Sequence, residues 1–389
     1  MTRTLEILDR LIGFATVSAD SNLGLVDYVQ DFLTTRGYAV HRIADPAGEK
    51  AGLFARLGPP GAGVMLSAHS DVVPVAGQDW TREPFALTRD GGRVFGRGTT
   101  DMKGYLACVL ALADRAARAG LREPLKIALS YDEEIGCVGI GHMIDHLKRT
   151  IGLPRACIVG EPTGMQVAIG HKGKAALRAA CFGEAGHSAL APKFLNALHL
   201  AADFVTELRN LQDDIAANGA RDPDYDIPYS TVHVGTLHGG SALNIVPDRA
   251  LIDFEIRYLA EDPLDRLLTR IHACADRVTA RHRAKFAAAR ITLDQRTAYP
   301  GLDAPREDAA FALSLAQSAL TKVPFGTEAG YFAGLGIPTV VCGPGDMQGQ
   351  GHKPDEYIEL SQLAACDAMM DRLLVELTGT HPEAKGTRA

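Results

Sequence analysis

The chain has 389 residues, 46% hydrophobic and 22% charged, a composition that is ordinary for a globular protein, and its length favours two domains. The formal net charge of -7 argues against nucleic acid or an anionic membrane surface as the main partner, and no stretch approaches the ~20 apolar residues of a membrane span. Seven scattered cysteines without a C-x-x-C pair, together with a start that lacks a secretory signal, favour the cytoplasm and argue against a cysteine-ligated zinc site.

The first part of the chain alternates helical and strand patterns. In chain order, the predicted elements are helices at 4–15 and 23–36, strands at 38–43, 51–57 and 63–68, a helix at 103–120, a strand at 124–134, a helix at 142–150 and a strand at 155–162. Strands separated by helices indicate an α/β sheet with helices on both faces.

The pattern changes after about residue 173. Strands at 174–186, 230–240, 250–260 and 289–298 and helices at 195–212 and 263–283 follow in the order βαββαβ, which is typical of a small sheet with two helices on one face. From residue 299 the α/β pattern returns with a strand at 337–345 and a helix at 360–377, and the polar tail 380–389 is predicted to be disordered. We therefore expect a catalytic domain made of 1–173 and 299–389, interrupted by an inserted domain at 174–298.

Polar side chains follow the predicted strands of the larger domain. They are His69, the pair Glu133 and Glu134, Glu161 and His352, with Asp101 just ahead of a helix. Ligands of open α/β sheets bind beyond the carboxyl ends of the strands, so we expect these six groups to converge on one edge despite their separation in the chain.

The convergence of imidazole and carboxylate groups predicts a metal site. Such ligands suit zinc, and six groups are too many for one tetrahedral ion but fit two ions about 3.5–4 Å apart. Each ion would take one histidine and one glutamate, Asp101 would bridge them, and the remaining glutamate could act as a base. Asp71 is placed to accept the second N–H of the His69 imidazole. Taken singly, Asp101 could instead cap a helix, and the two adjacent glutamates could form a solvated acidic turn.

Six motifs together carry a family resemblance. HSDVVPV, GRGTTDMKG, DEEIG, GEPT, GHSA and GHKPDEY resemble, in order, the motifs of the dinuclear-zinc deacylase and exopeptidase family, which includes acetylornithine deacetylases, succinyl-diaminopimelate desuccinylases, aminoacylases and carboxypeptidase-type enzymes. The resemblance covers nearly the whole chain. It implies a zinc-exopeptidase-like mixed sheet with an inserted α+β domain for dimerisation and lid closure. The length and the stretch GTEAGYF are most similar to the acetylornithine deacetylases.

The resemblance also implies roles for the clustered residues. One zinc would be held by His69 and Glu161, the other by Glu134 and His352, with Asp101 between them; Glu133 would be the general base, and Asp71 would support His69. Cobalt or manganese also suits such ligands. The family further implies a cis peptide bond after the bridging aspartate, so we expect Asp101–Met102 to be cis.

The inserted domain contributes further candidates by the same resemblance. His187 in GHSA would stabilise the oxyanion from the partner subunit of a homodimer, although many relatives have GHSS there. Asn244 and Arg257 match positions that bind the α-carboxylate of the substrate, a task that suits a guanidinium fork. Arg257 could also be an ordinary surface arginine on a strand. Lys172 and Gly173 mark the crossing between the domains and resemble hinge residues.

The expected activity is that of a metal-dependent amidohydrolase on a small N-acyl amino acid. N-acetyl-L-ornithine, in arginine biosynthesis, is the first expectation because Glu328 in GTEAGYF could pair with a cationic side chain; this residue could equally cap a surface helix. A desuccinylase, aminoacylase or dipeptidase of the same family is the alternative. A non-catalytic relative is disfavoured because the base and every ligand position are present.

Overall fold

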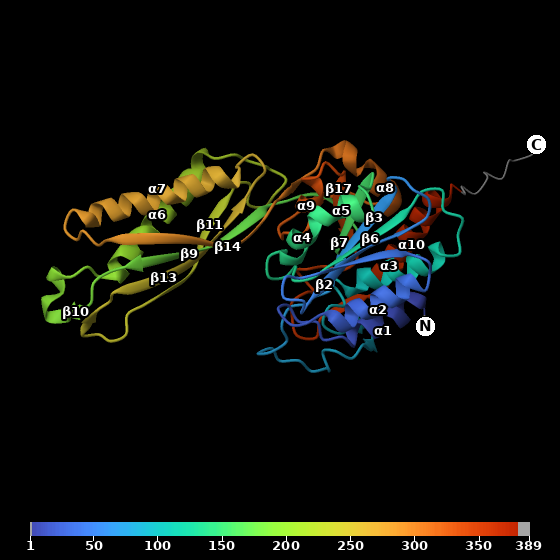
Figure 1. The fold of residues 1–389 in the computed structure, drawn as a ribbon, viewed down its shortest axis with the longest axis horizontal. Helices are drawn as coiled ribbons and strands as arrows, with labels where there is room; N and C mark the ends of the chain where they lie inside the picture. Colours follow the sequence, from blue (N-terminus) through green and yellow to red (C-terminus); the bar gives the residue numbers. More distant parts are fainter. Residues whose placement is uncertain (1, 380–389) are drawn as a thin grey trace, which may run out of the picture. The chain divides into compact units, whose positions relative to one another are not determined.

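The computed structural model describes residues 2–379, so the tail predicted to be disordered lies outside the described residues. The chain forms two compact units (Figure 1). The first runs to Gly170 and resumes with Asp303–Val323 and from Thr327 onward; the second comprises His171–Leu302 and Pro324–Gly326. In the described part of the chain, no helix has both the length and the apolar character that a membrane crossing requires.

A nine-stranded mixed sheet forms the centre of the first unit, which confirms the mixed sheet that the family resemblance implied. Its order is β1 (Ala39–Ala44), β2 (Ala51–Leu57), β6 (Leu125–Ser130), β3 (Val64–His69), β7 (Ala156–Pro162), β17 (Thr339–Gly343), β8 (Val167–His171) and β15 (Leu302–Asp303), with β16 (Leu320–Val323) paired to β8. The strands β6, β3, β7 and β17 run parallel to one another. Their side chains are buried along the whole strand, which explains their continuous apolar sequence.

Helices cover both faces of this sheet. They are α1 (Arg3–Ile12), α2 (Leu23–Thr34), α3 (Lys103–Ala116), α4 (Val138–Met143), η1 (Ile144–His146), α5 (Leu147–Thr150), η3 (Arg306–Ala309), α8 (Ala310–Ala316), α9 (Ala329–Ala333) and α10 (Leu360–Thr378). Helices α1, α2, α3 and α10 share one core with alternate residues of the strands, such as Leu66 and Ile127. The helix predicted at 142–150 instead begins at Val138 and changes type twice, after a turn in which Gly136 and Cys137 have positive φ.

A small second sheet, which the sequence pattern did not predict, brings two distant loops of the first unit together. It contains β4 (Thr88–Asp90), β5 (Arg93–Phe95) and β18 (Tyr357–Glu359). Phe95 pairs with Tyr357 and Val94 with Ile358, so the loop that follows β5 lies beside the loop that precedes β18. These loops carry Asp101 and His352, two of the candidate ligands.

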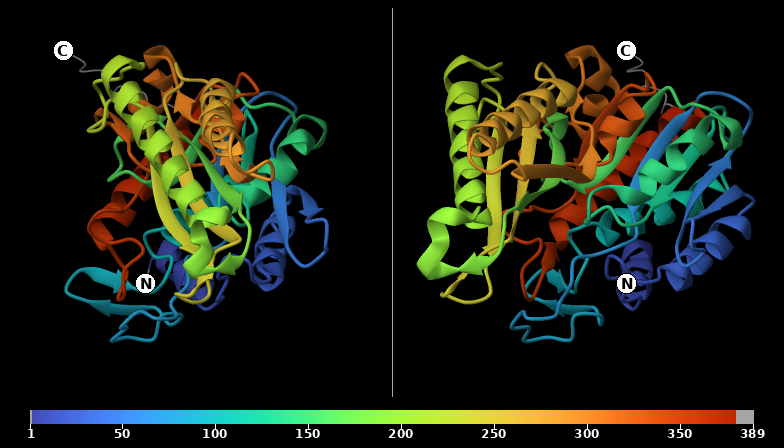
Figure 2. Two further views of the ribbon diagram at one scale, coloured as in Figure 1. Left: turned by 90° about the vertical axis from the view of Figure 1, so that its left-hand side faces the viewer. Right: turned by 60° about the vertical axis from the view of Figure 1, so that its left-hand side comes forward.

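The second unit is a four-stranded antiparallel sheet with two long helices on one face (Figure 2). The elements are β9 (Gly173–Phe182), β10 (Gly186–His187), η2 (Ser188–Lys193), α6 (Ala197–Asn218), β11 (Thr231–Gly239), β12 (Ile245–Val246), β13 (Arg249–Tyr258), α7 (Leu264–Arg283) and β14 (Arg290–Tyr299). The sheet order is β11-β13-β9-β14, and β10 pairs separately with β12. Alternate residues such as Leu177 and Phe254 pack under α6 and α7, in agreement with the predicted βαββαβ order.

Candidate metal centre

The parallel strands of the first unit end at one edge, and the candidate ligands lie there. His69 is the last residue of β3, Glu161 lies near the end of β7, and Glu133 and Glu134 follow the end of β6. The loop after β17 carries His352, and Asp101 precedes α3. The structure thus brings together all six groups that the sequence placed at this edge.

Asp101 lies between the two histidines. Its Oδ1 is 3.1 Å from Nε2 of His69, and its Oδ2 is 3.0 Å from Nε2 of His352. Each carboxylate oxygen therefore faces a different imidazole, as a bridging ligand requires. Asp101 does not cap α3, because the residue at the N-cap is Met102 and no side chain accepts a hydrogen bond there. The Asp101–Met102 peptide bond is cis, which confirms that expectation.

Each histidine also has a glutamate beside it. Nε2 of His69 is 3.6 Å from Oε1 of Glu161, and Nε2 of His352 is 3.1 Å from Oε2 of Glu134. Four ligand atoms placed about 2.1 Å from a tetrahedral zinc are about 3.4 Å apart, so these spacings suit two neighbouring ions.

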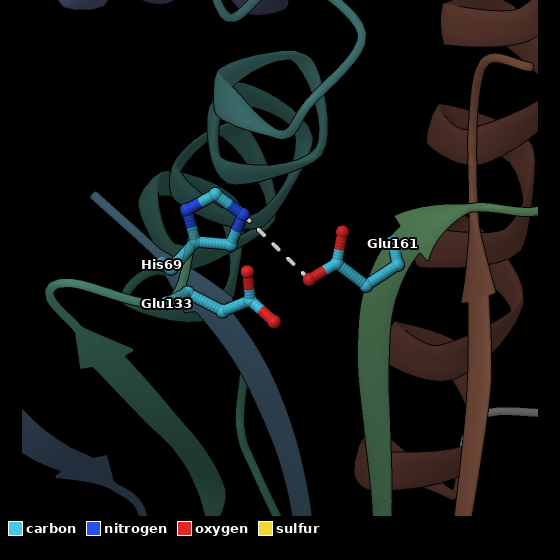
Figure 3. A group of neighbouring side chains, drawn as sticks. All are labelled: His69, Glu133 and Glu161. Atoms are coloured by element: carbon cyan, nitrogen blue, oxygen red, sulfur yellow. Dashed lines mark ion pairs between the residues drawn. The ribbon is translucent and has the colours of Figure 1, made fainter. Parts of the chain in front are cut away.

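The surroundings of the Glu161 carboxylate also fit a site for a cation. Its Oε1 is buried and has no hydrogen-bond partner within the described residues. Figure 3 shows this carboxylate and that of Glu133 pointing toward the His69 ring, with the dashed line marking the ion pair from His69 to Glu161. A buried carboxylate oxygen that accepts no hydrogen bond and has only an imidazole at 3.6 Å is stabilised by a further positive charge, so the residues present fit a divalent metal ion.

The three glutamates of the cluster hold protons more tightly than usual, whereas for Asp101 the effect of burial is outweighed by hydrogen bonds from both histidines, which lower its pKa. Burial raises the pKa of Glu161 well above its usual range, and the Asp101 carboxylate adds to this increase. Burial likewise raises the pKa of Glu133 well above its usual range. Burial and Asp101 raise the pKa of Glu134 to about 7, although the hydrogen bond from His352 opposes the change. Like charges crowded in a buried site favour binding of a cation that balances them.

The pKa values of the two histidines are raised as well, although for them burial acts in the opposite direction. Burial lowers the pKa of His69, but Glu161 and the hydrogen bond to Asp101 outweigh it and raise this pKa well above its usual range. Burial also opposes protonation of His352, yet hydrogen bonds to Asp101 and Glu134 raise its pKa to about 10. Both rings thus lie in strongly negative surroundings that would equally attract a metal ion.

Asp71 connects the two glutamates of the β6 turn to His69. Its main-chain oxygen is 2.9 Å and its Oδ1 is 3.4 Å from Nδ1 of His69. The same carboxylate accepts the main-chain N–H groups of Glu133 at 3.0 Å and Glu134 at 3.3 Å, and the hydroxyl of Ser18 at 2.6 Å. Asp71 therefore contacts the imidazole most closely through its main-chain oxygen, and its carboxylate also fixes the turn that carries the proposed base, a contact that the sequence did not reveal.

Glu133 lies on the His69 side of the cluster. One set of ligand atoms that lie within 4.8 Å of one another combines His69, Glu133 and Glu161, and a second combines His69, Asp101 and Glu134. The thiol of Cys137 donates a hydrogen bond to Oε1 of Glu133 at 3.3 Å. The pair of adjacent glutamates is therefore not a solvated acidic turn.

Glu328 is buried rather than exposed. It stands at the N-terminus of α9 but makes no capping hydrogen bond, and only 1% of its surface is exposed, so the surface-cap alternative is wrong. Burial raises the pKa of Glu328 to about 7, while Ser130 and the charge of His69 oppose the change. This carboxylate lies on the His69 side of the cluster.

The candidates of the second unit fall into two groups at opposite ends of its sheet. His187 pairs with Ile245, and the N–H of Ser188 donates to the main-chain oxygen of Asn244, so His187 and Asn244 are neighbours. Arg257 is opposite Lys174, at the other end of β13, where it donates hydrogen bonds to Glu255 and Tyr299. The eight residue steps from Lys174 to Phe182 on β9 span about 26 Å. One copy of this unit therefore does not place Arg257 beside His187 and Asn244.

Comparison with known proteins identifies the family. Residues 65–376 match the profile of the peptidase family M20/M25/M40. An acetylornithine deacetylase from Myxococcus xanthus is 32% identical over 378 residues, covering 96% of this chain and 97% of the relative. Another from Proteus mirabilis is 30% identical, covering 95% of each chain.

Solved structures show the same fold. An M20 family metallo-carboxypeptidase from Sulfolobus solfataricus has a TM-score of 0.77 at 18% identity, covering 97% of this chain and 99% of that one. A dinuclear metal-binding peptidase of the M20 family from Bacillus subtilis has a TM-score of 0.68 at 15% identity, covering 97% and 98%. The chain therefore belongs to the peptidase family M20/M25/M40 and is an amidohydrolase.

Proposed function

We propose that this enzyme hydrolyses the amide bond of an N-acyl amino acid with two divalent metal ions, zinc first among them. The observation that carries the proposal is the position of Asp101, whose two oxygens face Nε2 of His69 and Nε2 of His352 at 3.1 and 3.0 Å. Glu161 would complete the first metal position and Glu134 the second. Such ions polarise an acyl carbonyl and acidify water.

The protein groups then control proton transfer and orientation. Glu133 would take a proton from the attacking water and give it to the nitrogen of the leaving amine, which requires one carboxylate within reach of both atoms. Asp71 fixes the main chain of Glu133 by accepting its N–H at 3.0 Å and thereby holds the turn from which the base extends. His187 would donate a hydrogen bond to the developing oxyanion, and the forked guanidinium of Arg257 would bind the α-carboxylate.

N-acetyl-L-ornithine is the proposed substrate because two relatives of 32% and 30% identity, matched over nearly their whole length, are named acetylornithine deacetylases. Glu328 adds no support through direct contact, since it is 1% exposed. The test compares kcat/KM for N-acetylornithine, N-succinyl-diaminopimelate and N-acetylmethionine on enzyme reconstituted with zinc. We expect N-acetylornithine to give the highest value. A higher value for either other compound would reassign the substrate, and hydrolysis of none would overturn the proposed activity.

We further propose that the active form is a homodimer in which His187 serves the partner's site. The separation of about 26 Å along β9 between the Arg257 end and the His187 end supports this arrangement, because a small substrate cannot contact both groups from one chain. His187→Ala and Glu133→Gln proteins should each be nearly inactive. Mixed as heterodimers, they should recover part of the activity, because one site regains both groups. No recovery in proven heterodimers would show that the site is built from one chain.

The compartment proposed is the cytoplasm, where a deacetylase that releases ornithine for arginine biosynthesis would act. All seven cysteines are free and buried, as expected for a protein of a reducing compartment.

A further inference from the structure

A fully buried ion pair lies beside the candidate metal centre, and the reaction described above does not use it. Nη1 of Arg97 is 2.6 Å from Oε2 of Glu356, and the two side chains are 1% and 0% exposed. Burying a pair of charges is costly unless hydrogen bonds satisfy the remaining atoms, so the further contacts of the two groups indicate what the pair does.

Glu356 holds the loop that ends at Asp101. Its Oε1 accepts the main-chain N–H groups of Gly98 at 3.1 Å, Thr100 at 2.9 Å and Asp101 at 3.2 Å. One carboxylate oxygen thus gathers three donors of the loop 98–101. Because Glu356 is four residues beyond His352, this contact links the main chain of one ligand to the loop of the other.

Arg97 and Gln78 hold the His352 loop from the other side. Arg97 donates to the main-chain oxygen of Lys353 at 3.4 Å and to Oε1 of Gln78 at 2.5 Å. The amide nitrogen of Gln78 in turn donates to the main-chain oxygen of His352 at 3.1 Å. The guanidinium also stacks over the ring of Trp80, 5.0 Å from its centroid. The position of His352 therefore depends on a chain of contacts that begins at Glu356.

His352 needs this support more than His69 does. Nδ1 of His69 is held by Asp71, whereas every hydrogen bond of the His352 ring to the described residues involves Nε2. The His352 side chain is also 40% exposed, compared with 1% for His69. Among the described residues, no side chain thus bonds to Nδ1 of His352 to orient the ring. The orientation must instead be set by the main chain of His352.

We propose that Arg97, Glu356 and Gln78 are positioning residues that set the separation of Asp101 and His352 and thereby the affinity for the second metal ion. The proposal rests on the proposed dinuclear function. It concerns the ion held by His352 and Glu134 and predicts a smaller effect on the ion held by His69 and Glu161.

The principal test is Glu356→Gln in the full-length protein. A glutamine has one acceptor oxygen and an NH2 group, so it cannot accept from Arg97 and from three main-chain donors at once. Metal-free protein is titrated with Co²⁺ while its visible absorption is recorded, and the step that belongs to the second ion is identified by its loss in His352→Ala. We expect the dissociation constant of that step to rise 10–100-fold, the usual effect of removing a group that supports a ligand, with the first step changed less than threefold.

The matched control is Glu359→Gln. Glu359 pairs with Arg93 at 2.7 Å in the neighbouring strands β18 and β5, but this pair is exposed, and neither residue contacts a ligand loop through its side chain. Both Co²⁺ steps should remain unchanged in this variant. Unchanged steps in Glu356→Gln, or steps weakened by the same factor, would overturn the positioning role.

A milder variant covers the case in which Glu356→Gln does not fold, as judged by circular dichroism and thermal unfolding. Gln78→Leu removes the link to the main chain of His352 at a half-buried position. We expect it to raise the second dissociation constant three- to tenfold with an unchanged first step, and an unchanged second step would overturn the proposal. Wild-type protein that binds fewer than two Co²⁺ ions would contradict the dinuclear function itself, so the two failures are distinguishable.

Discussion

The two halves of the candidate metal centre are built in different ways. In the His69 half, the ligand ends a buried central strand and Asp71, two residues along the chain, holds its imidazole. In the His352 half, the ligand lies in a loop, has a positive φ of 59° and is held through its main chain by Gln78. The first half is thus fixed by local sequence and sheet packing, and the second by contacts between distant segments.

This difference shows how one site can combine rigidity with adjustability. A strand in the middle of a nine-stranded sheet cannot shift without moving its neighbours, so His69 has a fixed position. A loop held by a few hydrogen bonds opens at a lower free energy than a central strand. Substitutions near the site should therefore displace His352 more readily than His69. Variants that affect the halves unequally would therefore sharpen the comparison, and variants that affect them equally would break it.

The largest expected effect is that of Glu133→Gln. If Glu133 transfers protons and is not a ligand, kcat should fall about 10²–10⁴-fold while both halves keep their metal ion. The measurements are steady-state kinetics and metal content by atomic emission, with Glu123→Gln, an exposed residue paired to Arg155, as control.

If the Glu133→Gln protein lost one metal ion, the assignment of ligands to the two halves would change. Atoms of His69, Glu133 and Glu161 lie within 4.8 Å of one another, so Glu133 would then be a third ligand of the His69 half. The base would have to be sought among the other carboxylates.

The second prediction concerns the buried acid beside the His69 half. Glu328 has a pKa of about 7 in the folded protein against 4.5 in the unfolded chain, so the folded state keeps a proton that the unfolded state has released between these values. The stability of the metal-free protein should therefore fall as the pH rises through this window. Glu328→Gln removes this loss and should be more stable than wild type by about 3 kcal/mol at pH 8, with little difference near pH 4.5.

Urea unfolding of metal-free protein at pH 5 and pH 8 measures this effect. Glu359→Gln serves as the surface control, because Glu359 lies outside the buried region. A Glu328→Gln protein that gains no stability over wild type between the two pH values would show that the carboxylate is already ionised at low pH. The His69 half would then carry one more negative charge than its burial predicts.

The smallest of the three effects is expected for Asp71→Asn, which touches both halves. Asp71 orients His69 and accepts the main-chain N–H groups of Glu133 and Glu134. We expect the affinity for the His69 ion to fall 10–100-fold and that for the second ion to fall less, because only the turn of Glu134 is loosened there. A Co²⁺ titration gives both values, and a greater loss at the His352 half would reverse the assignment of Asp71.

Much of this architecture could be predicted from the sequence because the main signals are local. Apolar runs that end in a histidine or a glutamate indicated strands of an open α/β sheet, and the edge rule for such sheets gathered the six candidate groups without knowledge of their contacts. The pairing of Asp71 with His69 followed from a spacing of two residues in an extended chain. The βαββαβ order of the second unit followed from periodicity.

The remaining features depend on loop conformations that periodicity does not describe. Arg97 and Glu356 are 259 residues apart, and their contact arises only when β5 pairs with β18. Each lies in a short motif rich in glycine or proline, and the opposite charges of the two motifs were the available signal. Glu328 was expected either to pair with a cationic side chain of the substrate or to cap a surface helix, and only the packing around α9 shows that it is buried.

The pairing of Phe95 with Tyr357 joins two segments that leave the ribosome at different times, so it also bears on the stage of translation at which the enzyme becomes complete. During translation, the ribosome releases the residues of the His69 half long before His352 emerges. A nascent or prematurely terminated chain that stops ahead of His352 would keep the ligands of one ion and lack a ligand of the other. The chain would thus become able to hydrolyse amides only after its last segment is synthesised. Truncated chains should therefore be unable to act on the amides of the cell.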